Sequence, residues 1–130
     1  MNLTPHPPVF IVDDEEAVRT SLSRLLGAIG VPTETYPSAT AFLSAYAPGR
    51  AGCLVVDVRM PGMSGLDLMI ELRRRSIHIP VILMTGHTDE HSLQGLEGER
   101  PFGFLEKPFS IKDLRALVER WRATLTPGAS

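Results

Sequence analysis

The feature that most constrains the fold of this 130-residue sequence is an alternation of short apolar runs with stretches of helical periodicity. A parallel sheet with helices on both faces produces this pattern, because its strands are buried on both sides and each connection is a helix. Five runs are candidate strands, at residues 9–12, 33–36, 53–56, 81–84 and 102–105. The second and fifth runs are less apolar than the others, which predicts that they form the edges of the sheet.

The segments between these runs have the spacing of amphipathic helices. Apolar residues recur every three or four positions in three stripes, which we interpret as core packing. The stripes comprise Val18, Leu22, Leu25, Leu26 and Ile29; Phe42, Leu43 and Tyr46; and Ile111, Leu114, Leu117, Val118 and Trp121. Ser38 and the Ser-x-x-Asp sequences that start at Ser64 and Ser110 have the chemistry of helix N-caps. The basic run at residues 73–75 fits the solvated end of a helix.

Composition limits the kind of protein that this chain can be. With 43% hydrophobic residues it can bury one core, so we expect one domain at residues 1–124 and a tail or linker at 125–130. A net charge of −2 argues against direct nucleic-acid binding. The single cysteine, Cys53, excludes an intrachain disulfide and fits a reducing compartment. Without a secretory signal or an apolar run of membrane length, the expected protein is soluble and cytoplasmic, with no membrane partner.

Polar side chains follow four of the five predicted strands. In an open parallel sheet, ligands bind beyond the carboxyl ends of the strands, so these residues form the candidate site. Asp13 and Asp14 follow the first run, Asp57 the third, Thr85 the fourth and Lys107 the fifth. An isolated acidic pair after a strand more often caps the next helix. Three carboxylates at one edge, however, repel each other unless a cation lies among them, and carboxylate oxygens suit Mg²⁺.

A metal ion in this pocket would allow it to accept a phosphoryl group, because the ion neutralises the phosphoryl oxygens. Asp57 would then be the nucleophile and form an acyl phosphate. Thr85 and Lys107 would bind the remaining phosphoryl oxygens through a hydroxyl group and a positive charge. The chemistry predicted from these residue types is phosphoryl transfer to a carboxylate.

Four motifs, in this order, resemble the response-regulator receiver domains of two-component signalling, and among them the FixJ-type branch. The motifs are IVDDEE at 11–16, VVDVRMPGMSG at 55–65, MTGH at 84–87 and LEKPF at 105–109. The resemblance implies a flavodoxin-like (βα)5 fold, an α/β doubly wound parallel sheet of strand order 2-1-3-4-5. This order agrees with the edge positions expected for the second and fifth strands.

The resemblance also implies a metal site and the residues that form it. It makes Asp57 the phosphoacceptor, with Mg²⁺ or Mn²⁺ bound directly by Asp14 and Asp57. Asp13 would act on the metal through water, and the backbone carbonyl of Arg59 would complete the protein ligands.

Further roles implied by the resemblance lie around the phosphoryl group. Lys107 would bind the phosphoryl group, in a cis peptide bond with Pro108. Thr85 and Phe104 would form the switch pair that reports phosphorylation. His87, two residues after Thr85, would influence the approach of water or a phosphodonor.

The family resemblance implies a signalling role for the whole chain. The phosphodonor would be a histidine kinase or a phosphotransfer protein, and the chain would slowly lose its own phosphoryl group rather than act as an enzyme with turnover. Output would pass through the face of the fourth helix, fifth strand and fifth helix, with a homodimer through that face on phosphorylation. It would control transcription through a DNA-binding domain outside this chain. Two alternatives are a single-domain phosphate relay and a degenerate receiver that acts as an interaction module.

Two other classes of protein share features with this sequence and fit it less well. A flavodoxin-type electron carrier needs a hydroxyl- and glycine-rich loop after the first strand to hold the FMN phosphate, whereas residues 13–16 are DDEE. A phosphatase with an aspartyl nucleophile commonly places a second acid two residues later, where this chain has Arg59.

One segment departs from the family pattern. Receiver domains usually have small residues before the lysine motif, whereas residues 98–104 read GERPFGF. Gly95 and Gly98 disfavour a helix, and Pro101 disfavours helical backbone at Arg100. We therefore expect residues 91–103 to be the least stable part of the fold and to reorganise on phosphorylation.

Overall fold

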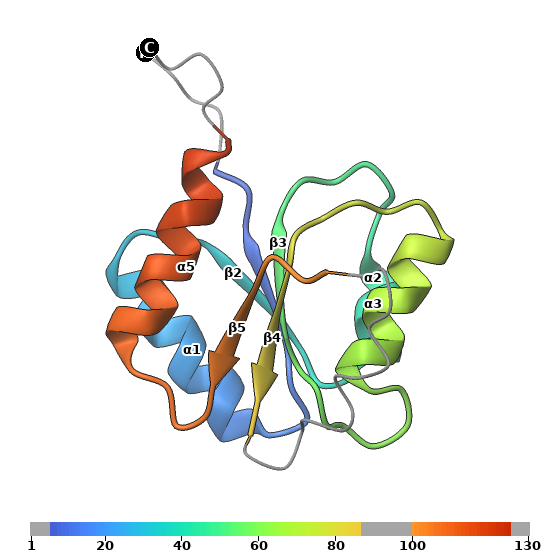
Figure 1. The fold of residues 1–130 in the computed structure, drawn as a ribbon, viewed down its shortest axis with the longest axis horizontal. Helices are drawn as coiled ribbons and strands as arrows, with labels where there is room; N and C mark the ends of the chain where they lie inside the picture. The colour runs from blue at the N-terminus through green and yellow to red at the C-terminus, as the bar shows by residue number, and fades with distance from the viewer. Residues whose placement is uncertain (1–5, 87–99, 126–130) are drawn as a thin grey trace.

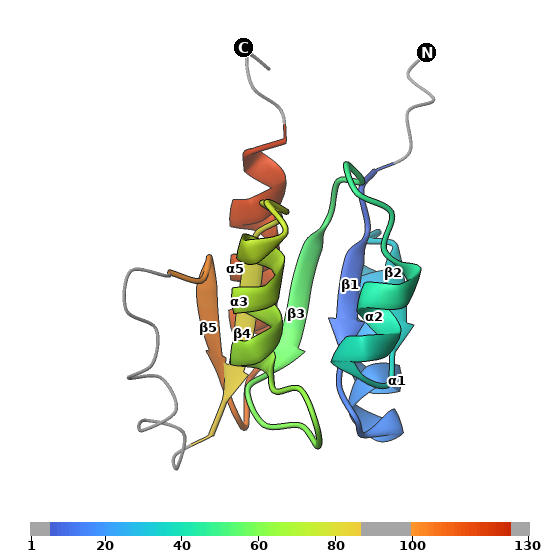
Figure 2. The same ribbon diagram turned by 90° about the vertical axis from the view of Figure 1, so that its right-hand side faces the viewer.

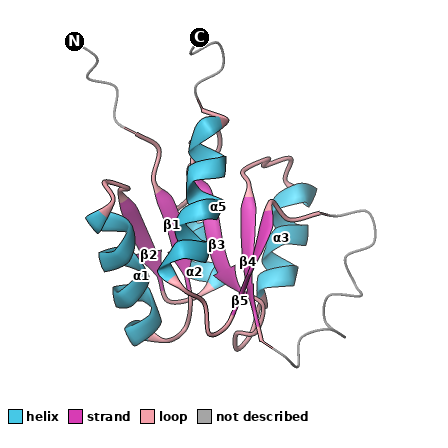
Figure 3. Ribbon diagram, turned by 60° about the vertical axis from the view of Figure 1, so that its left-hand side comes forward, coloured by secondary structure: helices cyan, strands magenta, loops and turns pink. Residues whose placement is uncertain are grey.

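The computed structural model describes residues 6–86 and 100–125, which form a five-stranded parallel sheet between two layers of helices (Figures 1 and 3). The strand order is β2-β1-β3-β4-β5. The elements are β1 (Val9–Val12), α1 (Glu16–Ala28), β2 (Thr33–Tyr36), α2 (Ala39–Ala45), β3 (Cys53–Asp57), α3 (Gly65–Arg74), β4 (Val81–Thr85), β5 (Gly103–Glu106) and α5 (Ile111–Ala123). The predicted α/β class, strand order and edge positions of the second and fifth strands are confirmed.

Two apolar cores lie on opposite faces of the sheet. Helices α2 and α3 cover one face, and α1 and α5 cover the other (Figures 1 and 2). The three central strands are buried along their whole length, whereas both edge strands are partly exposed. This difference explains why the central runs are continuously apolar and the edge runs are not.

The boundaries of three strands differ from the predicted ones by one residue, in β5 at both ends. β3 and β4 continue through Asp57 and Thr85, because Asp57 pairs with Met84 and Thr85 pairs with Glu106. β5 begins at Gly103 rather than at residue 102. The polar residues expected to follow the third and fourth strands are therefore the last residues of those strands.

The predicted helix stripes pack as expected, with one exception. The stripe residues of α1 and α2 all lie in the two cores, as do Leu114, Leu117, Val118 and Trp121 of α5. Ile111 was predicted to join them but is 44% exposed. It is the first residue of α5, so it precedes the turn at which this helix meets the sheet.

The predicted helix caps are present. The hydroxyls of Ser38, Ser64 and Ser110 each accept a hydrogen bond from a backbone N–H of the following turn, at 3.1 Å. At Ser64 the carboxylate of Asp67 also accepts from the Ser64 N–H, which completes a capping box. This motif fixes the start of α3 close to the end of β3.

Cys53 and the basic run at residues 73–75 have the surroundings expected from the sequence. Cys53 is a buried free thiol, and burial raises its pKa to about 12, which agrees with an unreactive core residue. In the basic run, Arg74 and Arg75 both bind Glu71 on the exposed surface of α3. Within the two described ranges, no helix has the length and apolarity needed to cross a membrane.

Ser76 provides a test of local backbone conformation. It is the one described non-glycine residue with a positive φ, 60°, directly after the C-cap of α3. Its N–H donates to the Arg73 carbonyl at 2.9 Å, and the N–H of Ile77 donates to the Leu72 carbonyl at 2.8 Å, which closes the last turn. We expect Ser76→Gly to raise the free energy of unfolding by about 0.5–1 kcal/mol, because a Cβ is disfavoured in this region.

The matched control for Ser76→Gly is the same substitution within a helix. Ser21→Gly, at an exposed position within α1, should lower the free energy of unfolding by about 0.5 kcal/mol. Urea denaturation measures both variants, and a Ser76→Gly protein less stable than the wild type would contradict the interpretation.

Candidate functional site

Three polar side chains are buried at the end of the sheet where all five parallel strands have their carboxyl ends. Asp13 is 0% exposed, Asp57 7% and Thr85 8%, and they are the only buried polar or charged residues in the part of the chain that the structure describes. Asp13 follows β1, while Asp57 and Thr85 end β3 and β4. Burial of two carboxylates is costly unless they have partners, so the partners of these residues indicate what the site does.

Asp57 is held by both of its carboxylate oxygens. Oδ1 accepts a hydrogen bond from the N–H of Arg59 at 2.8 Å, and Oδ2 accepts one from Nζ of Lys107. The backbone of the following loop is fixed by the N–H of Gly65, which donates to the carbonyl of Val58 at 3.1 Å. One oxygen is thus oriented by the main chain, and the other is in contact with a cation.

Asp13 is also oriented, but one of its oxygens lacks a hydrogen bond. Its Oδ1 accepts from the N–H of Glu15 at 2.8 Å. Its Oδ2 is buried without a hydrogen-bond partner and lies 3.8 Å from Nζ of Lys107. Burial raises the pKa of Asp13 to about 6; the Glu15 N–H and Lys107 oppose the rise, whereas the charges of Asp57 and Asp14 add to it.

Lys107 connects the two buried carboxylates. Its backbone N–H donates to the carbonyl of Thr85 at 2.7 Å, which holds the β5–α5 connection against the end of β4. Burial lowers the pKa of its ammonium group, but the hydrogen bond and charge of Asp57 outweigh this effect, so the pKa is raised. The peptide bond between Lys107 and Pro108 is cis, as the family resemblance implied.

The acidic residues after β1 could hold a metal ion. Carboxylate oxygens of Asp13, Asp14 and Glu15 lie within 4.8 Å of one another. The interpretation of these acids as helix caps finds no support, because the N-cap of α1 is Glu15 and its side chain makes no capping hydrogen bond. The unpartnered oxygen of Asp13 and the hard oxygen donors around it suit a small divalent cation, so the residues present fit Mg²⁺ or Mn²⁺.

The structure places the remaining predicted site residues as follows. Asp14 and Arg59 are exposed at the rim. Phe104 is 48% exposed on β5 and pairs with Leu83, while Thr85 pairs with the residue two positions further along β5. Thr85 and Phe104 therefore lie diagonally on the same face of the sheet. His87 and residues 91–99 of the segment predicted to reorganise lie outside the described residues.

Two residues near the site were not singled out from the sequence. Arg19 donates from Nη1 to the backbone carbonyl of Asp13 at 2.7 Å. Gly65 lies so close to Asp57 that a Cβ at this position would be 2.3 Å from the Asp57 carbonyl oxygen. The position of Arg19 in the first turns of a predicted helix was a usable signal, because such side chains point back toward the preceding strand. No local pattern indicated the contact of Gly65.

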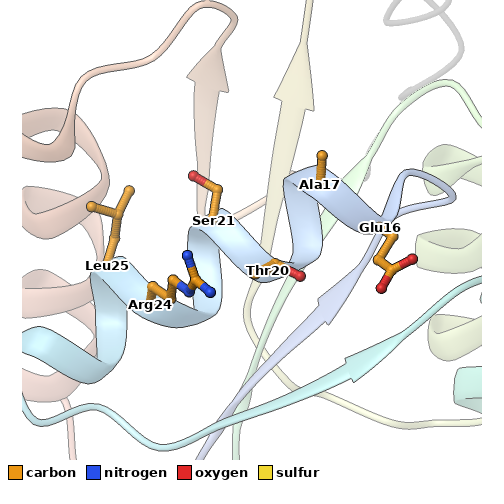
Figure 4. A pocket seen from close by; sticks show the side chains of 6 residues that line it. All are labelled: Glu16, Ala17, Thr20, Ser21, Arg24 and Leu25. Atoms are coloured by element: carbon orange, nitrogen blue, oxygen red, sulfur yellow. The ribbon is translucent and has the colours of Figure 1, made fainter.

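Two of the surface grooves along α1 differ in whether they reach the site. The larger, of about 650 Å³, is lined by Glu16, Ala17, Thr20, Ser21, Arg24 and Leu25, which Figure 4 shows spread along the helix. It does not include either buried carboxylate. The second, of about 510 Å³, lies between α1 and the β5–α5 connection, and its lining includes Glu15, Ala17, Ser21 and Lys107. The second groove therefore reaches the site.

Comparison with known proteins identifies the family. The model of the response regulator receiver domain matches residues 9–119, so the chain belongs to that family and is a receiver domain of two-component signalling. The chain is 46% identical over 118 residues to the transcriptional regulatory protein FixJ of Azorhizobium caulinodans, covering 91% of this chain and 54% of that protein. It is 38% identical over 112 residues to the DNA-binding transcriptional regulator NtrC of Salmonella typhimurium, covering 86% and 24%.

Solved structures agree with this identification. The crystal structure of FixJ-N superposes with a TM-score of 0.81 at 39% identity, covering 90% of this chain and 94% of that one. Full-length FixJ from B. japonicum gives a TM-score of 0.85 at 34% identity, covering 97% and 62%. The chain spans about half the length of the curated FixJ protein that it matches. The predicted resemblance to receiver domains of the FixJ type is thus confirmed, and these relatives are transcriptional regulators that extend beyond the span matched here.

The burial of Asp13 predicts that its charge destabilises the fold in the absence of a metal. Its pKa is raised from the ordinary value of 3.8 to about 6, so the penalty is present above about pH 6. It decreases as the pH falls below about 6 and is lost below about pH 3, where both the folded and unfolded forms bind the proton. We expect Asp13→Asn in EDTA to raise the free energy of unfolding at about pH 7.5 by about 1–2 kcal/mol, and the difference to decrease toward zero as the pH approaches about 3.

Urea denaturation across this pH range tests the prediction for Asp13. The control is Asp14→Asn at the neighbouring exposed position, which should change the free energy of unfolding by less than about 0.5 kcal/mol. An Asp13→Asn protein less stable than the wild type at neutral pH in EDTA would show that the charge of Asp13 stabilises the metal-free fold.

Proposed function

We propose that Asp57 accepts a phosphoryl group from a histidine kinase or phosphotransfer protein with the help of a bound divalent metal, and that this reaction controls a transcriptional output. The observation that carries the proposal is the pair of buried carboxylates at the strand ends, with Lys107 between them and one oxygen of Asp13 without a hydrogen bond. A structural ion pair would need only one acid, whereas this arrangement has an uncompensated negative charge beside an oriented carboxylate.

The geometry supports Asp57 as the nucleophile. The Arg59 N–H orients one oxygen of its carboxylate, and Lys107 contacts the other. In the reaction, an oxygen of Asp57 forms a bond to phosphorus while the bond from phosphorus to the donor's imidazole nitrogen breaks, and the imidazole leaves with the bonding electron pair. Lys107 then exchanges the carboxylate oxygen for a phosphoryl oxygen, and the Thr85 hydroxyl donates to another.

The metal would be held by Asp14, Asp57 and the carbonyl of Arg59, with Asp13 acting through water. Mg²⁺ or Mn²⁺, when bound, neutralises charge on the phosphoryl oxygens. Support for this ligand set comes from the carboxylate oxygens gathered at the end of β1 and from the buried Oδ2 of Asp13. Glu15, which is not among the predicted metal ligands, lies in the same acidic cluster.

The phosphodonor would approach through the groove between α1 and the β5–α5 connection. This groove contains Lys107 at one end and the small side chains of Ala17 and Ser21 along its wall, so a partner helix could lie close to the site. The half-exposed Phe104 of β5 belongs to the proposed output face, which comprises the fourth helix, β5 and α5. A homodimer through this face is part of the proposal.

The proposal includes the organisation of the longer protein. Residues 1–124 would form the receiver domain, and residues 125–130 would be a tail or the start of a linker to a DNA-binding output domain, because the curated relatives extend beyond the span they share with this chain. The protein would act in the cytoplasm and, apart from slow loss of its own phosphoryl group, would have no enzymatic turnover.

Phosphorylation with a small-molecule donor tests the proposed function without a kinase. Incubation with phosphoramidate and Mg²⁺ should add one phosphoryl group, visible by intact mass, and EDTA should prevent it. Treatment with hydroxylamine should remove the group, since an acyl phosphate is labile to that nucleophile. A protein that remains unmodified with Mg²⁺ and excess donor would refute the assignment in favour of a degenerate receiver.

A further inference from the structure

The backbone of Asp13 is held on both sides as the chain leaves the sheet. Its N–H donates to the carbonyl of Tyr36 at 3.2 Å, in continuation of the pairing between β1 and β2. Its carbonyl accepts the hydrogen bond from Nη1 of Arg19 at 2.7 Å. Because Asp13 is fully buried, water cannot easily replace this donor if it is removed. Arg19 thus satisfies a carbonyl that lies beyond the strand and before the helix.

The side chain of Asp13 depends on the same short segment. Oδ1 is bound by the N–H of Glu15, and the carbonyl of Glu15 accepts from the backbone N–H of Arg19 at 3.1 Å. Arg19 therefore contacts the segment twice, once through its backbone and once through its guanidinium group. Of the polar atoms of Asp13, only Oδ2 has no hydrogen bond, and it faces Lys107. The direction of this oxygen is set by the contacts that fix the rest of the residue.

We infer that Arg19 is a positioning residue for the metal site: its hydrogen bond to the Asp13 carbonyl keeps Oδ2 of Asp13 directed into the site and so raises the affinity for a divalent cation. The inference rests on the proposed function, because it assumes that a metal binds there. Arg19 does not touch the reacting atoms. Its removal should weaken metal binding while leaving the nucleophile Asp57, held by Arg59 and Lys107, in place.

The competing explanation is that Arg19 contributes only positive charge near three acids. Arg24 provides the control, since it lies on the same helix, is exposed and lines the groove shown in Figure 4. Replacing either arginine removes the same charge from α1, but only Arg19 bonds to Asp13. A long-range charge effect acts in both variants, whereas a positioning effect is confined to Arg19.

The experiment measures Mn²⁺ binding by isothermal titration calorimetry for the wild type and four variants. Arg19→Ala and Arg19→Met, which keeps an aliphatic stem, should each raise the dissociation constant about tenfold, as loss of an outer contact at a metal site commonly does. Arg19→Lys, which retains a donor, should recover part of the affinity. Arg24→Ala should change it by less than about twofold. If Arg19→Ala does not fold, as judged by thermal melting, the dissociation constants of Arg19→Met and Arg19→Lys are compared instead.

A second readout separates positioning from a general structural defect. The Mg²⁺ concentration for half-maximal phosphorylation by phosphoramidate should rise about tenfold in Arg19→Met, while the rate at saturating Mg²⁺ stays within about threefold of the wild type. The inference is overturned if Arg19→Met binds Mn²⁺ as tightly as the wild type, if Arg24→Ala weakens binding equally, or if only the saturating rate falls. If the wild type itself does not bind Mn²⁺, the proposed metal site fails and this inference fails with it.

Discussion

Asp57→Asn is expected to abolish phosphorylation by phosphoramidate, with a rate at least about 1,000-fold below that of the wild type at saturating Mg²⁺. The amide oxygen can still accept the hydrogen bond from the Arg59 N–H, so we expect the loop after β3 to keep its conformation. It lacks the nucleophilic oxygen and the charge that binds Lys107. Intact mass spectrometry at a series of times measures the effect directly.

Two comparisons make the Asp57→Asn experiment specific. Asp113→Asn changes an exposed acid in the first turn of α5 that is not one of the proposed site residues, and should leave the rate within about twofold. A thermal melt of Asp57→Asn shows whether the fold is intact. If Asp57→Asn gains the same mass at the wild-type rate, another carboxylate is the acceptor, and peptide mapping would first examine Asp13 and Asp14.

The architecture could be predicted from the sequence because the composition of each strand reflects how deeply that strand is buried. β1, β3 and β4 are buried on both faces and consist almost entirely of apolar residues, whereas β2 reads TETY and is partly exposed. Because only edge strands can carry so many polar groups, part of the strand order could be inferred from composition. The misplacement of Ile111 has the opposite cause: periodicity shows which face of a helix is apolar but not where the helix first meets the sheet.

Most of the candidate site could also be predicted, because the topology of a parallel sheet brings strand ends together. Asp13, Asp57, Thr85 and Lys107 were selected by their positions after apolar runs, and the first three are the buried polar residues of the described chain. All four lie within residues 9–119, the range that matches the family. What the sequence could not show is that Lys107 contacts Asp57 and approaches Asp13, since this depends on side-chain direction.

Contacts to backbone atoms were the part of the site that sequence reasoning missed. Arg19 binds a carbonyl, and Gly65 approaches one. Every residue has a carbonyl, so such partners leave no pattern of residue types in the sequence. The structure shows that these two carbonyls belong to Asp13 and Asp57, which is why the contacts of Arg19 and Gly65 matter for the site.

The electrostatics of the site support the proposed role of a metal beside the lysine. Lys107 supplies one positive charge and binds Asp57, while Asp13 keeps a buried oxygen without a hydrogen bond and a pKa raised to about 6. Lys107 is therefore shared by two buried carboxylates, and exposed Asp14 and Glu15 add further negative charge at the rim. A divalent ion would compensate this excess and would release Lys107 to bind an incoming phosphoryl group.

Gly65→Ala is expected to affect both stability and phosphorylation. A Cβ on Gly65 would lie 2.3 Å from the carbonyl oxygen and 2.9 Å from the carbonyl carbon of Asp57, and 3.1 Å from Cα of Val58. These are backbone atoms at the end of a buried central strand, so they cannot move aside as a flexible side chain can. We expect the free energy of unfolding to fall by about 2–4 kcal/mol.

Phosphorylation should respond to Gly65→Ala because the clash displaces the acceptor itself. If α3 and the end of β3 separate, the carboxylate of Asp57 moves relative to Lys107, and the rate with phosphoramidate at saturating Mg²⁺ should fall by about 10- to 100-fold. Gly27→Ala is the control: a Cβ at that position in α1 meets nothing within 4 Å, so the variant should gain about 0.5–1 kcal/mol and keep the wild-type rate. Should Gly65→Ala be as stable and as rapidly phosphorylated as Gly27→Ala, the close approach of α3 to Asp57 does not position the acceptor.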